Sequence, residues 1–448
     1  MQRFGRFCVV FIFAASLPAF PQAVQNDGQP KKPEETAPYA NMPAAAVPYA
    51  RYRKAYHDFF VTPDTLEYNG AARNVPDGDI NELQTINLGF LGPLGADNPE
   101  SPYGIAMLHG AEMAIDDANT QGGYRGKPFA LKVHNDLPLW GASSMEIVKM
   151  DFDEHVWAML GSIDGASTHI ALRATLKLEI PMVNTAATDP TDTETRIQWL
   201  LRDFPDDRQQ GYALADYIFN QRKLQRVAII RANNRYARIG FAKFFDMARR
   251  MGHQPLVVVK YGAEEQNLPA LLQRLNDTGM DALVIWGNAT EAGRIVKEMR
   301  AMGMKQPVFG SSRIAYPELM KVGGPAAEGL VAICAMDPSR DDPKWQDFRQ
   351  RYVARYKTEP DAYASYAYDG MTIMINAVRK AGLNRGRIMD ALREYAQKKY
   401  DGVSGEAFFD YTLNNIAPVT FGEVKDGKFV YWPEHRTDRN SQPVALVH

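Results

Sequence analysis

The chain has 448 residues, of which 45% are hydrophobic and 23% charged, so it is long enough for two or three globular domains. Lys and Arg together number 51 and Asp and Glu number 53, which gives a net charge of −2. This balance argues against nucleic acid as a partner. The two cysteines, Cys8 and Cys334, are too few for a disulfide framework or a thiolate metal site.

Residues 1–23 have the features of a secretory signal peptide. Arg3 and Arg6 precede an apolar run over residues 7–20, and the small residues Ala19 and Ala23 offer cleavage positions. The run is shorter than the roughly 20 residues that a membrane-spanning helix needs, so a retained anchor is the weaker alternative. The sequence therefore predicts an exported, soluble protein.

Residues 24–83 are rich in Pro, Ala, Asn and charge and show no sustained period of 2 or 3.6. This composition predicts a linker followed by an irregular arm. The arm also carries several aromatic residues, and we therefore expect Pro48–Tyr68 to pack on the domain that follows.

From residue 84, short apolar β-branched runs alternate with amphipathic stretches, a pattern typical of βαβ units. The predicted strands are Thr85–Leu91, Phe129–Asn135, Val156–Leu160 and Pro181–Asn184. The predicted helices between them are Gly104–Gln121, Ser143–Phe152 and Ser167–Leu178.

A second series of the same kind follows a break at Arg202–Asp207. Its predicted strands are Arg226–Arg231, Leu256–Tyr261, Ala282–Trp286 and Val308–Gly310, with helices at Arg208–Arg222, Arg238–Met251, Leu268–Thr278 and Glu291–Met302. The remaining chain offers a strand at Leu330–Met336, helices at Lys344–Lys357, Tyr363–Lys380 and Arg385–Gln397, and short terminal strands. We predict an α/β protein with two doubly wound lobes, between which the chain crosses more than once. A ligand is expected in the cleft at the carboxyl ends of the strands.

Catalytic and nucleotide-binding motifs are missing from the sequence. The turn GFLGPLG (Gly89 to Gly95) lacks the spacing of a dinucleotide fingerprint, and Pro93 removes an amide donor. The eight histidines show no ligand spacing, and neither a phosphate-binding loop nor a nucleophile elbow occurs. We therefore expect no catalysis, no cofactor and no metal.

Small polar residues follow two strands of the first series. The turn GSIDGAST (Gly161 to Thr168) leads into a helix whose first amide groups attract anions. The alternative is that Ser167 or Thr168 only caps that helix. The turn VNTAATDP (Val183 to Pro190) ends in Thr188 and Asp189. The two turns can converge on one carboxylate.

Residues at the strand ends of the second series face the same cleft. They are Tyr236, Asn288, Ser312 and Arg313. Tyr236 is either a cleft residue or a half-buried surface tyrosine. Arg313 is the one basic residue among them, and it either pairs with an acid on the opposing lobe or receives an acid group of the ligand.

Over residues 84–435 the chain resembles the type I periplasmic solute-binding proteins of ABC transporters, in particular the branched-chain amino acid and amide-binding group. The resemblance rests on the order of INLGFLGPLG, HGAEMAIDDANTQGGYRGKPFAL, LGSIDGAST, IPMVNTAATDP, VAIIRANNRYARIG and PDAYASYAYDG. It implies two Rossmann-like lobes joined by three hinge strands. Lobe 1 would comprise 84–203 plus 337–415 and lobe 2 would comprise 204–336 plus 416–435, followed by a tail at 436–448.

The resemblance also implies a ligand site. Ala186 and Thr188 match positions that bind the ligand carboxylate. Gly165 stands where amino acid binders usually have a serine, which leaves the amides of Gly165 and Ala166 as donors. The aromatic positions that match those around the ligand are Tyr103, Tyr236 and Tyr363.

One departure concerns the charge on the ligand. Where amino acid binders place an acid for the ligand ammonium, this sequence has Ser312 followed by Arg313, and Asp164 could supply a charge only from lobe 1. A buried ammonium without a counter-charge is costly. We therefore expect a small organic acid, an amide or an aromatic acid before an aliphatic amino acid.

These observations predict a monomeric, non-catalytic periplasmic protein that delivers a small ligand to a membrane permease. A ligand-sensing or interaction module on the same fold is the alternative, and the long arm at 24–83 favours it.

Overall fold

A computed structural model describes residues 72, 76–137, 140–262, 265 and 267–434. The predicted export signal, the expected packing of Pro48–Tyr68 and the tail at 436–448 lie outside these residues. None of the helices in the described part is long and apolar enough to cross a membrane.

The first sheet has five strands in the order β2-β1-β3-β4-β5, all parallel. The strands are β1 (Ile86–Gly92), β2 (Phe129–Asn135), β3 (Met159–Gly161), β4 (Met182–Asn184) and β5 (Leu200–Arg202). The first four were predicted. The fifth was not predicted, and it ends at Arg202, the first residue of the segment that we interpreted only as a break.

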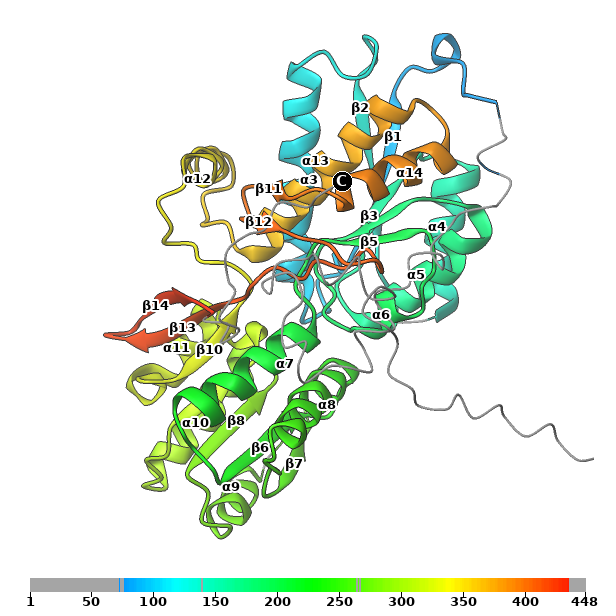
Figure 1. Cartoon of the computed structure of the whole chain (residues 1–448). Coiled ribbons are helices and arrows are strands. Elements are labelled where there is room, and N and C mark those ends of the chain that lie inside the picture. The colour runs from blue at the N-terminus through cyan, green and yellow to red at the C-terminus, as the bar shows by residue number, and fades with distance from the viewer. Residues whose placement is uncertain (1–71, 73–75, 138–139, 263–264, 266, 435–448) are drawn as a thin grey trace, which may run out of the picture.

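Helices cover both faces of this sheet (Figure 1). One face packs on α3 (Ser101–Thr120), α13 (Ala362–Ala381) and α14 (Arg385–Ala396) through a hydrophobic cluster. The other face packs on α4 (Trp140–Phe152) and α5 (Gly165–Leu178). A short helix, α6 (Thr191–Glu194), follows β4, and η5 (Ile80–Glu82) precedes β1. Burial on both faces explains why these strands read as continuous apolar runs.

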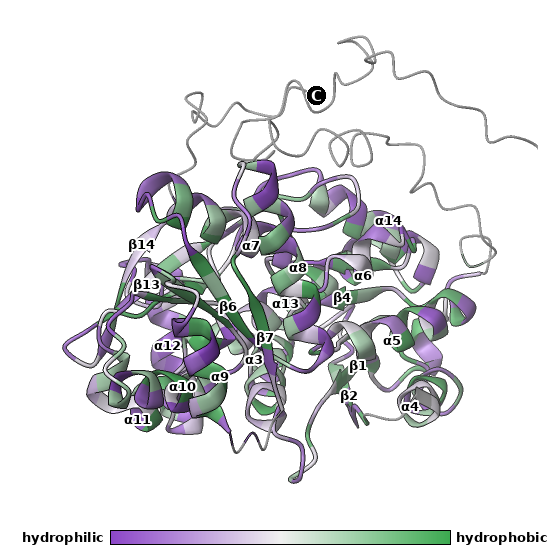
Figure 2. Ribbon diagram, turned by 90° about the horizontal axis from the view of Figure 1, so that it is seen from below, coloured by the Kyte–Doolittle hydropathy of each residue, from purple (hydrophilic) through white to green (hydrophobic). Residues whose placement is uncertain are grey.

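The second sheet has seven strands in the order β14-β13-β10-β9-β8-β6-β7. Its parallel strands are β6 (Val227–Ala232), β7 (Val258–Tyr261), β8 (Ala282–Trp286), β9 (Val308–Gly310) and β10 (Val331–Cys334). The hairpin of β13 (Thr420–Lys425) and β14 (Lys428–Pro433) adds two antiparallel strands. Figure 2 shows hydrophobic colour along β6, whereas the helices carry both colours, as an amphipathic helix does.

Four helical segments of the second lobe follow the predicted ranges closely. They are α7 (Asp207–Ala215) with η6 (Asp216–Gln221), α8 (Arg235–Arg250), α9 (Leu268–Asn276) and α10 (Ala289–Ala301). The short helices η7 (Ser312–Ile314), α11 (Pro317–Gly323) and η8 (Gly324–Ala327) were not predicted. Together with the second sheet they enclose a hydrophobic cluster of their own. The elements α12 (Pro343–Tyr356), β11 (Tyr400–Asp401) and β12 (Glu406–Ala407) stand beside the first lobe (Figure 1).

The chain passes between the lobes three times. It leaves the first sheet after β5, returns after β10 to form α12, α13 and α14, and crosses again to form the β13–β14 hairpin. Two crossings lie side by side, because Arg202 donates its backbone N–H to Leu413 O at 2.9 Å and accepts from Asn415 N at 2.8 Å. Each lobe thus has a sheet and a hydrophobic cluster of its own.

Candidate functional site

The two sheets share the strand order 2-1-3-4-5 in their parallel parts, which places the carboxyl ends of the central strands where a ligand is expected. In the first lobe these ends are followed by the turns that begin at Ser162 and Thr185. In the second lobe they are followed by the starts of α8, α10 and η7. The predicted site residues therefore come from the expected edges of both sheets.

Aromatic rings from both lobes meet between the sheets. Tyr103 of α3 lies 5.0 Å from Tyr363 of α13, measured between ring centroids, and 5.1 Å from Tyr316 of the second lobe. Phe204, just after β5, stacks on Tyr363 at 5.6 Å. The prediction named Tyr103 and Tyr363, and it missed Tyr316 and Phe204 because neither stands in a recognisable motif. Together the rings form an apolar surface suited to the body of a small ligand.

Arg313 is the most unusual charged residue of the site. Its side chain is 1% exposed, and it extends from η7 of lobe 2 to lobe 1. There Nη1 lies 2.5 Å from Glu100 Oε1, and Nη2 donates to Ile163 O at 3.2 Å. The guanidinium carbon lies 4.1 Å from the centre of the Tyr236 ring, a cation–π contact. Of the two alternatives for Arg313, the structure shows the pairing with an acid on the opposing lobe.

Tyr236 and Tyr363 face this charge. Burial raises the pKa of Tyr363 to about 12, and the positive charge of Arg313 partly opposes the rise. Burial also raises the pKa of Tyr236 above its usual range. Both phenols are therefore neutral near pH 7 and can donate hydrogen bonds. Tyr236 is 8% exposed, so it is a buried interlobe residue and not a half-buried surface tyrosine.

The turn at the start of α5 is arranged differently from the prediction. The cap is Asp164, whose Oδ1 accepts from Ser167 N at 2.9 Å, so of the alternatives for this turn, capping by Ser167 or Thr168 does not occur. Gly165 is buried, and a Cβ at this position would collide with the carboxylate of Asp189. The serine that amino acid binders usually have would not fit here. Ala166 is exposed.

The second turn uses its donors within the protein. Ala186 N and Ala187 N both donate to Asn184 Oδ1, at 3.1 and 2.8 Å. Thr188 Oγ1 donates to Asp207 Oδ2 at 3.0 Å, and Asp207 N donates to Thr188 O at 2.7 Å. A ligand carboxylate at this turn would therefore compete with Asn184 and Asp207.

Asp207 is a functional candidate that the sequence reasoning missed. Its side chain is fully buried at the start of α7, and Oδ1 has no hydrogen-bond partner within the described residues. Desolvation, followed by the nearby charge of Asp189, raises its pKa well above the usual range. The pair Asp206–Asp207 reads in sequence as an ordinary helix start, and Asp206 does form that cap. Only the fold shows that the second acid points elsewhere.

Two other predicted residues, Ser312 and Asn288, are less directly connected to the site around Arg313. Ser312 is 7% exposed, and its backbone N donates to Gln210 Oε1 of α7 at 3.3 Å. Asn288 precedes α10 and is half-buried, and its Oδ1 has no hydrogen-bond partner among the residues described. No hydrogen bond among the described residues joins Asn288 to Arg313 or to the tyrosines.

A second ionic contact joins the lobes beside the first. Arg235, the first residue of α8, donates from Nε to Asp189 Oδ2 at 2.8 Å and from Nη2 to Thr191 Oγ1 at 3.2 Å. Lys243 of the same helix lies 3.6 Å from Glu194 Oε1. The lobes are therefore in contact through ionic pairs as well as through the aromatic rings.

Two doubly wound lobes, three crossings and a ring of polar and aromatic residues between the lobes define a two-lobed solute-binding protein. The chain belongs to the periplasmic binding protein family, whose sequence model matches residues 85–428. This membership confirms the expected resemblance and fold class.

Individual relatives agree with this assignment. The Leu/Ile/Val-binding protein homolog 1 of Brucella suis biovar 1 is 27% identical over 341 residues, which cover 74% of this chain and 90% of the relative. The branched-chain amino acid transporter substrate-binding protein LivJ of Streptococcus pneumoniae, solved with isoleucine, is 25% identical with a TM-score of 0.70, covering 78% of this chain and 99% of that one. A solute-binding protein of Rhodopseudomonas palustris BisB5, solved with 3,4-dihydroxybenzoic acid, shares the fold at 17% identity and a TM-score of 0.70, covering 80% and 99%.

Proposed function

We propose that this protein is the exported substrate-binding component of an ABC transporter and that it recognises a small carboxylate-bearing ligand through Arg313. The observation that carries the proposal is the guanidinium of Arg313, 1% exposed and held between the lobes. A buried cation needs an anionic partner, and planar guanidinium groups suit carboxylates. In the present arrangement Glu100 provides that partner from lobe 1.

Glu100 is the exchangeable member of this pair. Its side chain is 21% exposed at the start of α3, so it can turn into water when the lobes separate. Arg313 is anchored by the Tyr236 ring and cannot be hydrated as easily. A ligand carboxylate would therefore take the place of Glu100 and form charge-assisted hydrogen bonds with Arg313. The rings of Tyr103, Tyr316 and Tyr363 would pack on the rest of the ligand.

Asp207 supplies the acceptor that the sequence analysis did not find. Oδ1 is buried and has no donor in the described part of the chain, and the residue lies close enough to Arg313 for their charges to interact. An ammonium group placed beside it would find a carboxylate once Asp207 loses its proton. Asp207 therefore supports an amino acid as the ligand, in agreement with the names of the relatives in Brucella and Streptococcus. An organic acid without an amino group remains the second ligand class.

The family supports the rest of the proposal. Its members are periplasmic binding proteins, which agrees with export and with capture outside the cytoplasmic membrane. Ligand contacts with both lobes would stabilise the closed form, and the closed form would be delivered to a permease. We further propose that the protein acts as a monomer, without catalysis.

The end of the N-terminal arm supports a sensing or interaction role as a second candidate. Gly78 N donates to Leu383 O at 3.1 Å, Asp77 pairs with Arg387, and Asn384 Nδ2 donates to Ala72 O at 3.0 Å. The arm is thus attached to lobe 1 near the α13–α14 turn. Removal of residues 24–75 tests this role, and ligand affinity should stay unchanged in either case. A pull-down partner that binds the full chain but not the shortened chain would support the second role. A partner that binds both chains equally would contradict it.

A thermal-shift panel tests the proposed function. The probes are L-leucine, L-isoleucine, L-valine, their amides, benzoate and 3,4-dihydroxybenzoate. A true ligand at 100 times its Kd should raise the free energy of unfolding by about 2.7 kcal/mol. The proposal expects a carboxylate in this set to stabilise the protein and its amide not to. Stabilisation by an amide equal to that by its acid would contradict the role of Arg313.

A further inference from the structure

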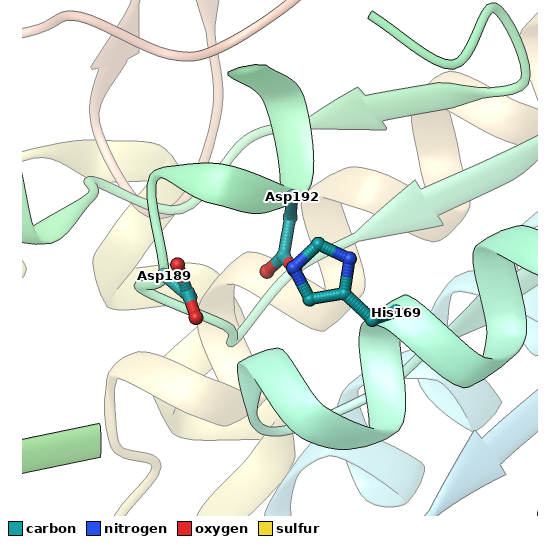
Figure 3. Close-up of side chains that lie close together, drawn as sticks. All are labelled: His169, Asp189 and Asp192. Carbon is teal, nitrogen blue, oxygen red and sulfur yellow. The ribbon is translucent and has the colours of Figure 1, made fainter. Parts of the chain in front are cut away.

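We propose that His169, Asp189 and Asp192 form a divalent-cation site on lobe 1, at the position where Arg235 of lobe 2 reaches Asp189. Figure 3 shows the three side chains directed toward one another from α5, from the turn after β4 and from α6. One ligand atom from each lies within 4.8 Å of the others. His169 Nε2 lies 3.3 Å from Asp192 Oδ1 and 2.7 Å from Thr191 Oγ1.

Asp192 gives the strongest indication of a ligand. Its residue is 1% exposed, and neither carboxylate oxygen has a hydrogen-bond partner among the described residues. The nearest guanidinium is that of Arg202, with Nη1 3.8 Å from Oδ2. Arg202 is directed to other acceptors, including Asp189 O at 2.5 Å, Asn414 Oδ1 at 2.8 Å and Asp206 Oδ2 at 3.2 Å. A buried carboxyl group whose oxygens accept no hydrogen bond is rare and needs an explanation, which a bound cation would provide.

Asp189 has one oxygen that belongs to lobe 1 and one that is held by lobe 2. Oδ1 accepts from Thr191 N and Thr191 Oγ1 at 2.9 and 2.7 Å, within lobe 1. Oδ2 is held by Arg235, with Nε at 2.8 Å and Nη2 at 2.7 Å. Separation of the lobes would withdraw Arg235 and free Oδ2. The cation and Arg235 would then compete for the same oxygen.

The donor set fits a zinc-like ion. One imidazole nitrogen and two carboxylates are common ligands of Zn²⁺, with bonds of about 2.0–2.2 Å. In tetrahedral geometry two ligand atoms on one such ion lie about 3.3–3.6 Å apart, so the separations of up to 4.8 Å here require Asp189 to rotate toward the other two ligands. Withdrawal of Arg235 permits that rotation.

Competition with Arg235 makes the site a regulator of lobe closure. A cation on Asp189 would keep Arg235 from closing onto lobe 1, and therefore favour the open form. By thermodynamic reciprocity, a ligand that closes the lobes would weaken cation binding by the same factor. This coupling rests on the proposed function, whereas the site itself does not. Sequence spacing could not reveal the site, because His169 stands on one helix and the two aspartates follow another strand.

Isothermal titration of the full chain with ZnCl₂, without any organic ligand, tests the site. We expect one site that His169→Ala and Asp192→Asn each weaken by about 10- to 100-fold. Arg235→Met should tighten Zn²⁺ binding by about 10-fold, since it removes the competitor. His155→Ala, on an exposed histidine of the same lobe, should change nothing.

Three outcomes would overturn the proposal. They are no Zn²⁺ binding at millimolar concentration, equal affinity in wild type and His169→Ala, and weaker binding in Arg235→Met. Failure of the proposed function would look different, because Zn²⁺ would still bind while no carboxylate in the panel stabilised the protein.

Discussion

Separate substitutions of Arg313 and of Glu100 should change ligand affinity in opposite directions. Arg313→Met removes the guanidinium that the ligand carboxylate needs. Glu100→Gln removes the group that occupies the guanidinium when no ligand is present, at an N–O distance of 2.5 Å. An ordinary ligand-contacting pair would instead lose affinity in both variants.

The magnitudes follow from the exposure of the two side chains. A hydrogen bond to a charged group contributes about 1.5–3 kcal/mol, so Arg313→Met should weaken binding of the carboxylate by about 10- to 150-fold. Glu100 is 21% exposed and partly hydrated, so its competition with the ligand for Arg313 contributes less free energy than the bond between Arg313 and the ligand. We expect Glu100→Gln to tighten binding by about 5- to 20-fold, which corresponds to about 1–2 kcal/mol.

Isothermal titration with the carboxylate selected by the thermal-shift panel measures both effects. Glu112→Gln is the matched control, because this glutamate stands on the same helix and bonds to Tyr356 on the outer side of lobe 1. It should leave affinity unchanged. Weaker binding in Glu100→Gln would refute the idea that Glu100 stands in for the ligand, and unchanged binding in Arg313→Met would refute the carboxylate subsite itself.

Three further predictions concern stability and protonation. Gly165→Ala should cost about 1–3 kcal/mol of unfolding free energy in the wild type but less in an Asp189→Gly background, since the added Cβ collides with the Cβ and the carboxylate of Asp189, and chemical denaturation of the four proteins measures the coupling. Additive costs would contradict the collision. Because the folded pKa of Asp207 is raised, the native state binds more protons than the unfolded state above the ordinary aspartate pKa, so this residue makes stability fall as pH rises through that window. Asp207→Asn should therefore be more stable than the wild type at pH 7 and lose that margin near pH 4, and a constant margin would contradict the raised pKa. Gly110→Ala should lower the free energy of unfolding by about 1–3 kcal/mol, because a Cβ there would collide with the carbonyl of Ala364 where α3 meets α13. A near-neutral change in the denaturation midpoint would contradict this packing.

The sequence predicted the architecture because buried parallel strands and amphipathic helices differ in period and length. Strands such as β8 (ALVIW) are buried along their whole length, so they appear in the sequence as continuous apolar runs that are easily recognised. The short β5 was not predicted, because Leu200–Arg202 ends in a charged residue and runs directly into the segment that interrupts the alternating pattern.

The site was predictable where a residue directly follows a strand and much less elsewhere. Arg313 and Tyr236 were found from such positions, and the structure brings them together. Glu100 and Tyr316 were not found, because their roles depend on contacts across the two lobes. The departure at Gly165 was visible in the sequence, but its cause, the carboxylate of Asp189, was not.

A structure of the protein with its carboxylate ligand tests the central claim most directly. The account predicts a ligand carboxylate within hydrogen-bonding distance of Arg313 Nη1, with Glu100 turned away from it. A ligand carboxylate bound only at the start of α5, near Gly165, with the Arg313–Glu100 pair still formed, would contradict the account.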